Sequence, residues 1–480
     1  MRKIILFELN EVPFGVVDYF CSQFPESALA RTLPKCTQVE TVTHDEGELS
    51  PWITWPTLHR GVSNHQHKIK DFGEDLGRVD GQFPPVWQIL AEAGLKPGVF
   101  ASMHTFPMPG NYQDYSFFVP DPFAGDSAAH PGHIEPFQQF NLAMSRKSGR
   151  NVDSGIDFKA ALNLAKSLPW LGLKPETFVA VGKQLLDERT SDWKKNRRRV
   201  FQSVLAFDVF YKLLKDRKPN FTTFFSNHVA STMHRYWAAT FPEDYSEYNL
   251  SDEWQQRFAG EIAYAMHWFD AFFKRLKQFA DNHPEYLLVV ASSMGQEATK
   301  AEELKTELYG ENFEKFVACT GLQASEWERK PAMHPQYNLS VVPEKEDFFL
   351  QQLRKFRVNG EPLVFRHKEN GFFSINLGHR NMEKEELVFD EQTMPFSTLG
   401  LKNEPVDDES DGTAYHIPEG ILLIYDPKET SLKTSRQTSA DSRAVAPSLL
   451  DNFGLSVPDY MVEERIVPLT GKSLKAGSLL

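Results

Sequence analysis

Thr54 lies in the part of the chain whose residue types come closest to a reactive site, the stretch from residue 51 to residue 69. A tryptophan–proline pair follows it directly. A threonine in this position can cap a helix or serve as a nucleophile, and the two roles are compatible, because a helix N-terminus stabilises a phosphate that the hydroxyl attacks. A threonine hydroxyl is a weak nucleophile by itself, so the chemistry requires a metal ion or a base nearby. His65 and His67 are interpreted as hydrogen-bonding residues of a turn.

Carboxylate and amide side chains surround the end of the first predicted strand, residues 4–9. Strand alternation places Glu8 and Asn10 on the same face, and Glu11 lies past the strand end. In an open parallel sheet, side chains just beyond the carboxyl ends of strands point into the ligand crevice. Glu8 and Glu11 are therefore candidate catalytic residues, and Asn10 is a candidate substrate-binding residue.

Further polar residues follow two later predicted strands. The strand 221–226 runs into Asn227 and His228, and the strand 287–291 opens into Ser293 and Gln296. These four are candidate substrate-binding residues at the same crevice. His228, His234 and His416 supply two or three imidazoles, which is enough for one zinc ion if a carboxylate joins them.

Strands and helices alternate along the chain. Residues 84–103 are expected to form a helix, a glycine stop at Gly94 and a strand, and an apolar stripe predicts a long helix over residues 256–280. The run of residues 419–427 is expected to return to the sheet. This alternation predicts an α/β fold, a doubly wound and mostly parallel sheet sandwiched by helices.

Five motifs, in order and each at a strand end, resemble the alkaline phosphatase superfamily in its type I phosphodiesterase and nucleotide pyrophosphatase branch. They include the Thr54 stretch, the helix 84–93 and the terminal run from Ala446 to Met461. The resemblance implies an alkaline phosphatase-like core with a helical insertion and a small cap. The expected core comprises residues 1–137, 219–299 and 416–480, the insertion residues 138–218, and the cap residues 300–415.

The resemblance also implies a nucleophile and metal ligands. Thr54, His234 and His416 stand at the family's nucleophile and ligand positions, whereas aspartates and a histidine of the usual set are replaced by Asn10, Ala230, Ser293 and Met294. Three lost aspartates remove three negative charges from a site for two divalent cations. We therefore expect one zinc-like divalent ion at His234 and His416 and no full binuclear centre.

Arg380 ends a segment, residues 373–380, that resembles a turn of the family's cap. Its guanidinium is a candidate bidentate donor to a phosphate, and an exposed loop arginine is the alternative. The basic run 194–199 is interpreted as a solvated helix face, with an anionic surface or a phosphorylated substrate as the alternative partner.

The composition limits the partners, the cellular compartment and the membrane association that we expect for the chain. With a net charge of −13 over 480 residues, the chain is not expected to bind nucleic acid. Three cysteines without metal-ligand spacing favour free thiols in a reducing cytoplasm. No apolar run long enough to span a membrane is present, and the short apolar start is predicted to be a buried strand and not a signal peptide. The oligomeric state is left open.

Three functional hypotheses follow. The first is a divergent phosphodiesterase or phosphatase acting on a small phosphorylated or nucleotide-sugar substrate, with Thr54 as nucleophile and one metal ion. The second is a glycosyl or phosphoryl transferase that uses the same phosphate crevice without a binuclear centre, with Glu8 or Glu11 as general base. The third is a non-catalytic pseudoenzyme that binds an anionic ligand.

Overall fold

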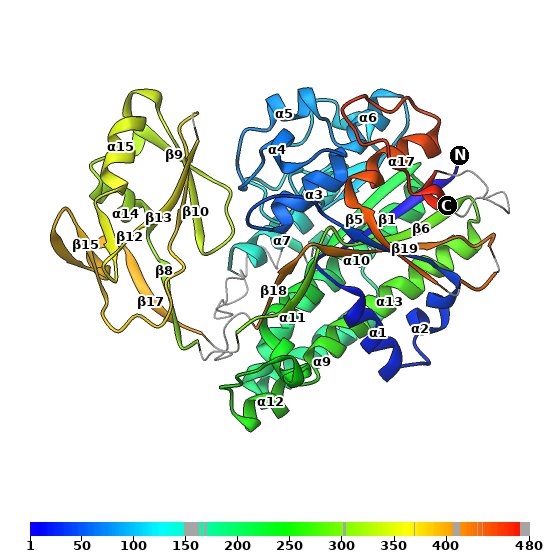
Figure 1. Ribbon diagram of the computed structural model, residues 1–480, viewed down its shortest axis with the longest axis horizontal. Coiled ribbons are helices and arrows are strands. Elements are labelled where there is room, and N and C mark those ends of the chain that lie inside the picture. Colours follow the sequence, from blue (N-terminus) through cyan, green and yellow to red (C-terminus); the bar gives the residue numbers. More distant parts are fainter. Residues whose placement is uncertain are drawn as a thin grey trace.

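The computed structural model describes residues 1–147, 163–164, 166–167, 170–300, 304–368, 370–406, 413–429, 431–433 and 435–470. The chain forms two lobes (Figure 1). The larger lobe holds the described residues of 1–300 and 413–470, and the smaller lobe holds those of 304–406. Each lobe has a hydrophobic core of its own.

An eight-stranded sheet forms the centre of the larger lobe, with the strand order β20-β2-β19-β6-β1-β5-β3-β4. All neighbouring strands are parallel except β19, which runs antiparallel to β2 and β6. The strands are β1 (Lys3–Leu9), β2 (Thr37–Val42), β3 (Gly98–Phe100), β4 (Phe117–Val119), β5 (Phe221–Ser226), β6 (Tyr286–Ala291), β19 (Glu419–Tyr425) and β20 (Arg436–Asp441). This order confirms the predicted doubly wound, mostly parallel α/β sheet.

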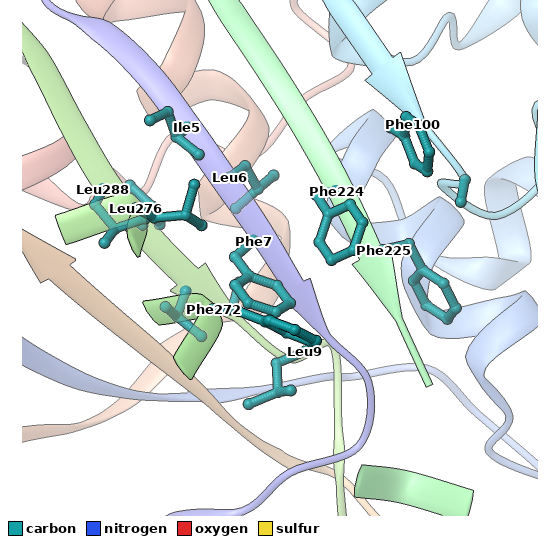
Figure 2. Close-up of a cluster of buried hydrophobic side chains, with 14 of the residues drawn as sticks. Ile5, Leu6, Phe7, Leu9, Phe100, Phe224, Phe225, Phe272, Leu276 and Leu288 are labelled. Atoms are coloured by element: carbon teal, nitrogen blue, oxygen red, sulfur yellow. The ribbon is translucent and has the colours of Figure 1, made fainter. Parts of the chain in front are cut away.

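Helices cover both faces of the sheet because side chains of the central strands alternate between two apolar layers (Figure 2). Phe7 of β1 meets Phe269 and Phe272 of α13 (Glu261–Asn282), with ring centroids 5.3 and 6.5 Å apart. Phe225 of β5 points to the other face, where its ring lies 5.9 Å from that of Trp55 in α3 (Pro51–Arg60). This alternation fixes which polar residues at the strand ends can meet.

The remaining helices complete these layers. On the α3 face lie α6 (Val86–Glu92) and α17 (Val445–Phe453), and on the α13 face lie α10 (Arg198–Arg217) and α11 (His228–Thr240). The other helices of the larger lobe are α1 (Phe14–Gln23), α2 (Ala28–Thr32), α4 (Asn64–His67), α5 (Gly77–Gln82), α7 (Glu135–Lys147), α9 (Pro175–Thr190) and α12 (Asp252–Phe258). Among the described helices, none combines the length and the apolar character that crossing a membrane requires.

Two sequence predictions about helices need refinement. The stretch predicted as one helix over residues 256–280 contains the end of α12 and most of α13, because Gly260 separates the two. Within the predicted insertion 138–218, α10 packs directly on the sheet: the ring of Phe210 stacks on that of Phe224 at 4.7 Å. The boundaries of core, insertion and cap remain predictions.

The basic run 194–199 is largely neutralised within the chain. Lys194 pairs with Asp187, Lys195 with Asp192, Arg197 with Glu261, and Arg198 with Glu188. These contacts agree with the interpretation of the run as a helix face, and they leave little of its charge for an anionic partner.

The smaller lobe is built from short antiparallel sheets. One contains β9 (Trp327–Lys330), β10 (Gln336–Val341), β13 (Val364–Lys368) and β14 (Phe372–Asn376), a second contains β11 (Phe356–Val358), β12 (Glu361–Pro362), β15 (Glu386–Phe389) and β16 (Gln392–Pro395), and a third pairs β8 (Thr306–Gly310) with β17 (Leu401–Pro405). Their helices are α14 (Phe313–Cys319), α15 (Glu346–Leu353) and α16 (Phe396–Leu399). The lobe docks on residues 68–74, where Arg366 pairs with Asp71 at 2.8 Å and the Asn338 side chain donates to the Phe72 carbonyl.

Candidate functional site

Most of the predicted site residues lie at the carboxyl ends of β1, β5 and β6, where a parallel sheet brings such positions together. Asn10 and Glu11 follow β1, Asn227 follows β5, and Ser293 follows β6. A two-stranded extension, β7 (Gly295–Ala298) paired with β18 (Ala414–Ile417), places Gln296 opposite His416. His234 approaches from α11, which begins directly after β5.

Glu11, His234 and His416 form the centre of the site. The Glu11 Oε2 atom lies 2.8 Å from His234 Nε2 and 3.3 Å from His416 Nε2. One donor atom from each residue lies within 4.8 Å of the other two. The site is closed around Glu11 and His416 and opens at His234, whose side chain is 28% exposed.

Both imidazoles are held by backbone carbonyls. His234 Nδ1 lies 2.7 Å from the Ala414 carbonyl oxygen, and His416 Nδ1 lies 2.7 Å from that of Leu49. A carbonyl only accepts, so each Nδ1 carries the proton and each Nε2 is turned to Glu11. Such an outer hydrogen bond is the arrangement that orients histidine ligands of metals. The buried His416 Nε2 faces the Glu11 carboxylate at 3.3 Å and has no other polar partner within the described chain, which also suits a ligand atom.

Opposite charge stabilises this centre without an ion. Burial raises the pKa of Glu11, but the charges and hydrogen bonds of His416 and His234 outweigh it and hold that pKa well below its usual value. Burial lowers the pKa of His416, and the Glu11 carboxylate reverses this and raises it above the ordinary value. Both shifts favour the charged pair, a carboxylate at Glu11 and a protonated imidazole at His416, and a metal ion would compete with that proton.

Amide side chains surround the carboxylate. The Asn10 amide donates to Glu11 Oε1 and to the Asn227 side-chain oxygen, both at 2.7 Å. Gln296 donates to Glu11 Oε2 and to the Ala230 carbonyl, and its own buried Oε1 has no partner in the described chain. The predicted residues Asn10, Asn227 and Gln296 are thus brought together with Glu11.

Thr54 is hydrogen-bonded to Ser293 through their hydroxyls at 2.7 Å. Both side chains are completely buried. The helix that carries Thr54 begins earlier than expected, with Ser50 as the N-cap and Pro51 in the first turn. The alternative role of Thr54 as a helix cap is therefore not observed: Thr54 is the fourth helical residue, and its hydroxyl donates back to the Ser50 carbonyl.

Glu8 and His228 lie away from the centre. Glu8 is fully buried under α3, where it pairs with His59 at 2.8 Å. His228 is turned toward α13: its Nδ1 lies 2.7 Å from the Ser226 hydroxyl, its ring lies 5.6 Å from that of Phe272, and burial lowers its pKa to about 3. Strand alternation explains why Glu8 is buried under α3: Glu8 and Asn10 lie on the same face of the sheet, and α3 covers that face.

Arg380 belongs to the smaller lobe. It is exposed, and its backbone forms an isolated antiparallel β-bridge with Glu307 of β8. His67 is a buried turn residue, bonded to Thr57 and to the backbone of Ile69, as predicted, whereas His65 is exposed and pairs with Glu46.

The residues present do not fit a two-metal centre. The Asn10 amide donates to Asn227, and its side-chain oxygen accepts from the Trp55 indole. The Ser293 hydroxyl is hydrogen-bonded to that of Thr54. Ala230 and Met294 are buried and offer no hard ligand atom from their side chains. One ion fits, because a carboxylate and two imidazoles with fixed orientation are a donor set that zinc takes.

Sequence reasoning missed how some of these partners are held. The Leu49 and Ala414 carbonyls orient the imidazoles, and Trp55 fixes Asn10 from α3. Backbone carbonyls carry no sequence signal. Glu11 has a left-handed backbone conformation, with φ of 59°, which turns its carboxylate toward the histidines. Glutamate is not a residue type that predicts this conformation, so nothing in the sequence indicated it.

Comparison with known proteins gives a distant likeness of fold. No family model matches the chain, and no curated protein sequence does. Among solved structures, an inactive form of murine ectonucleotide pyrophosphatase/phosphodiesterase 5 in complex with AMP is 12% identical, with a TM-score of 0.41 over 95% of this chain and 96% of that one. Phosphonoacetate hydrolase from Sinorhizobium meliloti 1021 in complex with phosphonoformate is 10% identical, with a TM-score of 0.40 over 93% and 94%. At these scores the likeness carries no inference about the site.

Proposed function

We propose that the chain is a divergent phosphodiesterase- or phosphatase-like enzyme for a small phosphorylated or nucleotide-sugar substrate, with one zinc-like divalent ion at Glu11, His234 and His416. The observation that carries the proposal is the convergence of these three donor atoms within 4.8 Å. When bound, such an ion polarises phosphoryl oxygens and stabilises their charge. The order of the sequence motifs, from the Thr54 stretch to the run at Ala446, supports the phosphoryl class.

The chain's own residues supply the rest of the site. Asn227 is an exposed amide at the open side that can donate to a phosphoryl oxygen. Asn10 and Gln296 already donate both amide hydrogens within the cluster, so their proposed contribution is to hold Glu11 in place. His234, the most exposed of the three central side chains, lies where a substrate enters. Arg380, outside this cluster, is retained only as a candidate contact to a longer substrate.

Thr54 remains the proposed nucleophile. Its hydroxyl is fixed by Ser293, so a deprotonating partner would act through that pair. The side chain is closed to solvent, however, and a substrate reaches it only after the residues above it move. This closure favours a second candidate function, binding of an anion without turnover.

The transferase alternative now rests on Glu11 alone. Glu8 is fully buried and engaged by His59, so it is not placed to act as a base on a bound donor. We also place the protein in the cytoplasm, with no nucleic-acid partner, a setting supported by the acidic composition and by the free thiols of Cys21, Cys36 and Cys319.

Metal analysis tests the proposal first. After incubation with zinc and desalting, the wild-type protein is expected to hold about one ion per chain, because three protein ligands suffice for a catalytic zinc. Glu11→Gln and His416→Gln are expected to lose it. Glu8→Gln is the matched control: it changes a buried carboxylate three residues away and should leave the metal content unchanged. Wild-type protein without bound metal would refute the site.

Hydrolysis of bis(p-nitrophenyl) phosphate then separates the candidates. Zinc-dependent turnover that disappears in Thr54→Ala supports the enzyme with Thr54 as nucleophile. Turnover that survives in Thr54→Ala overturns that role. Bound zinc without turnover of this or other phosphate esters favours anion binding, and metal-independent transfer from a nucleotide-sugar favours the transferase.

A further inference from the structure

The end of β1 is held against α3 by two polar contacts. Trp55 Nε1 donates to the Asn10 side-chain oxygen at 2.8 Å. One helical turn further on, His59 Nε2 lies 2.8 Å from Glu8 Oε1. All four side chains are buried. Four positions of a helix cover about 6.0 Å and two positions of a strand about 6.6 Å, so the two contacts fit side by side between helix and strand.

The Trp55 contact determines which way the Asn10 amide is turned. An indole N–H only donates, so it faces the amide oxygen and leaves the amide nitrogen on the other side. That nitrogen donates to Glu11 Oε1 and to the Asn227 side-chain oxygen, both at 2.7 Å. An amide turned the other way would set its N–H groups against the indole N–H and its oxygen against the Glu11 carboxylate. The indole and the carboxylate therefore require the same orientation.

The orientation of this amide matters because the two oxygens of Glu11 have different partners. Oε1 accepts from Asn10, whereas Oε2 lies 2.8 Å from His234 Nε2 and 3.3 Å from His416 Nε2. With Oε1 held by Asn10, the carboxylate cannot rotate away from the imidazoles without losing that hydrogen bond. The single N–H of Trp55 is used by Asn10, so Trp55 acts on Glu11 only through that amide.

We infer that Trp55 is a positioning residue that, through the Asn10 amide, aims the Glu11 carboxylate at the two imidazoles. The inference rests on the proposed function, since these imidazoles and Glu11 are the proposed ligands of the metal ion. An outer hydrogen bond that orients a metal ligand contributes about 10–100-fold to metal affinity. Trp55 lies one hydrogen bond further from the ion than Asn10, so its contribution is expected at the lower end, about tenfold.

Zinc titration of Trp55→Phe by isothermal titration calorimetry tests the inference. The variant keeps a buried aromatic ring and loses the N–H, and its dissociation constant for zinc is expected to rise about tenfold. Trp87→Phe is the matched control, because it changes another buried indole, whose ring lies 4.6 Å from that of His59, and leaves the Asn10 contact in place. Circular dichroism confirms that each variant is folded. Wild-type zinc affinity in Trp55→Phe overturns the inference.

A double-variant cycle separates positioning from packing. If Trp55 acts only through Asn10, then Trp55→Phe has no further effect on zinc affinity once Asn10→Leu has removed the amide. A ring that only fills space would weaken zinc binding by the same factor with and without the amide. The same fold-change in both backgrounds therefore overturns the positioning role.

A crystal structure of Trp55→Phe gives a readout that does not depend on zinc. The Asn10 amide is expected to turn and Glu11 Oε2 to move away from His234 and His416, and unchanged positions overturn the inference. Wild-type protein that binds no zinc refutes the proposed metal site, and this structure then decides the role of Trp55. Zinc bound equally well by the wild type and Trp55→Phe refutes that role and leaves the metal site standing.

Discussion

Glu11 shows how a single backbone conformation sets the chemistry of the site. With φ of 59° it occupies the left-handed region, which costs a non-glycine residue about 1 kcal/mol or more. The fold holds it there through the Asn10 and Gln296 amides and the two imidazoles. This conformation aims the Glu11 carboxylate at His234 and His416.

His228 illustrates the opposite case, a histidine that is buried for packing. Its pKa of about 3 means that it stays neutral in the folded protein, whereas in the unfolded chain it is protonated below about pH 6.5. The unfolded state therefore binds more protons as the pH falls, and acid destabilises the fold. We expect His228 to account for about 2 kcal/mol of the loss in free energy of unfolding between pH 7 and pH 5.

Urea unfolding at both pH values checks this expectation. His228→Gln should be less sensitive to the change of pH than the wild type by that amount. His65→Gln is the control, because its exposed side chain should leave the pH dependence as it is. Equal pH dependence in His228→Gln and the wild type would contradict the assignment of His228 as a neutral core residue.

At the scale of elements, aromatic layers position the strand ends that carry the site. Phe272 of α13 stacks on Phe207 of α10, with ring centroids 4.3 Å apart. Phe272 also lies against Phe7 of β1 (Figure 2). These rings join two helices to the strand that leads into Glu11. The rigidity of the site therefore depends on a face of the sheet to which the site itself does not belong.

Phe272→Ala should lower the free energy of unfolding of the larger lobe by about 3–5 kcal/mol, because it removes a buried ring and leaves a cavity. Phe272→Leu keeps most of the volume and should lower it by less. Denaturant titration followed by circular dichroism measures both. A loss below about 1 kcal/mol for Phe272→Ala would mean that the layer repacks and does not fix the strand.

At the scale of the molecule, the smaller lobe is joined to the larger one by polar contacts. Asp71 is completely buried, and Arg366 of β13 is its only ion-pair partner among the described residues. Lys368 adds a contact to Glu74. Both partners belong to the segment that follows the turn at His67, so the smaller lobe is attached to the chain just beyond α3.

Arg366→Ala should loosen this attachment, because it leaves a buried carboxylate without a cation. Removing one partner of a fully buried ion pair lowers the stability by about 3–5 kcal/mol. Because Arg366 is about one-third exposed, we expect Arg366→Ala to destabilise the attachment by about 1–2 kcal/mol. Faster hydrogen exchange at residues 68–74 is the measurement. Arg329→Ala, which removes an exposed pair with Glu314, should leave the exchange there unchanged. The same exchange rate in Arg366→Ala and the wild type would contradict the role of this pair.

The sequence by itself determined the elements and the edge of the sheet where polar residues meet. The runs at residues 4–9 and 221–226 were predicted as strands and are β1 and β5, and the predicted run 419–427 contains β19, because apolar stretches of that length bury both faces in an α/β sheet. It did not determine that β19 runs antiparallel, because hydrophobic pattern carries no strand direction.

Only the tertiary structure decided which candidates share one centre. Glu8 and Glu11 are alike as sequence signals, yet α3 covers the first, and a left-handed turn carries the second to two histidines more than 200 residues away along the chain. His228 and His234 lie on one helix, and the helical rotation between them sends one ring into the core and the other to Glu11. Local pattern fixes where a residue lies along the chain, but side-chain direction and long-range packing fix its partners.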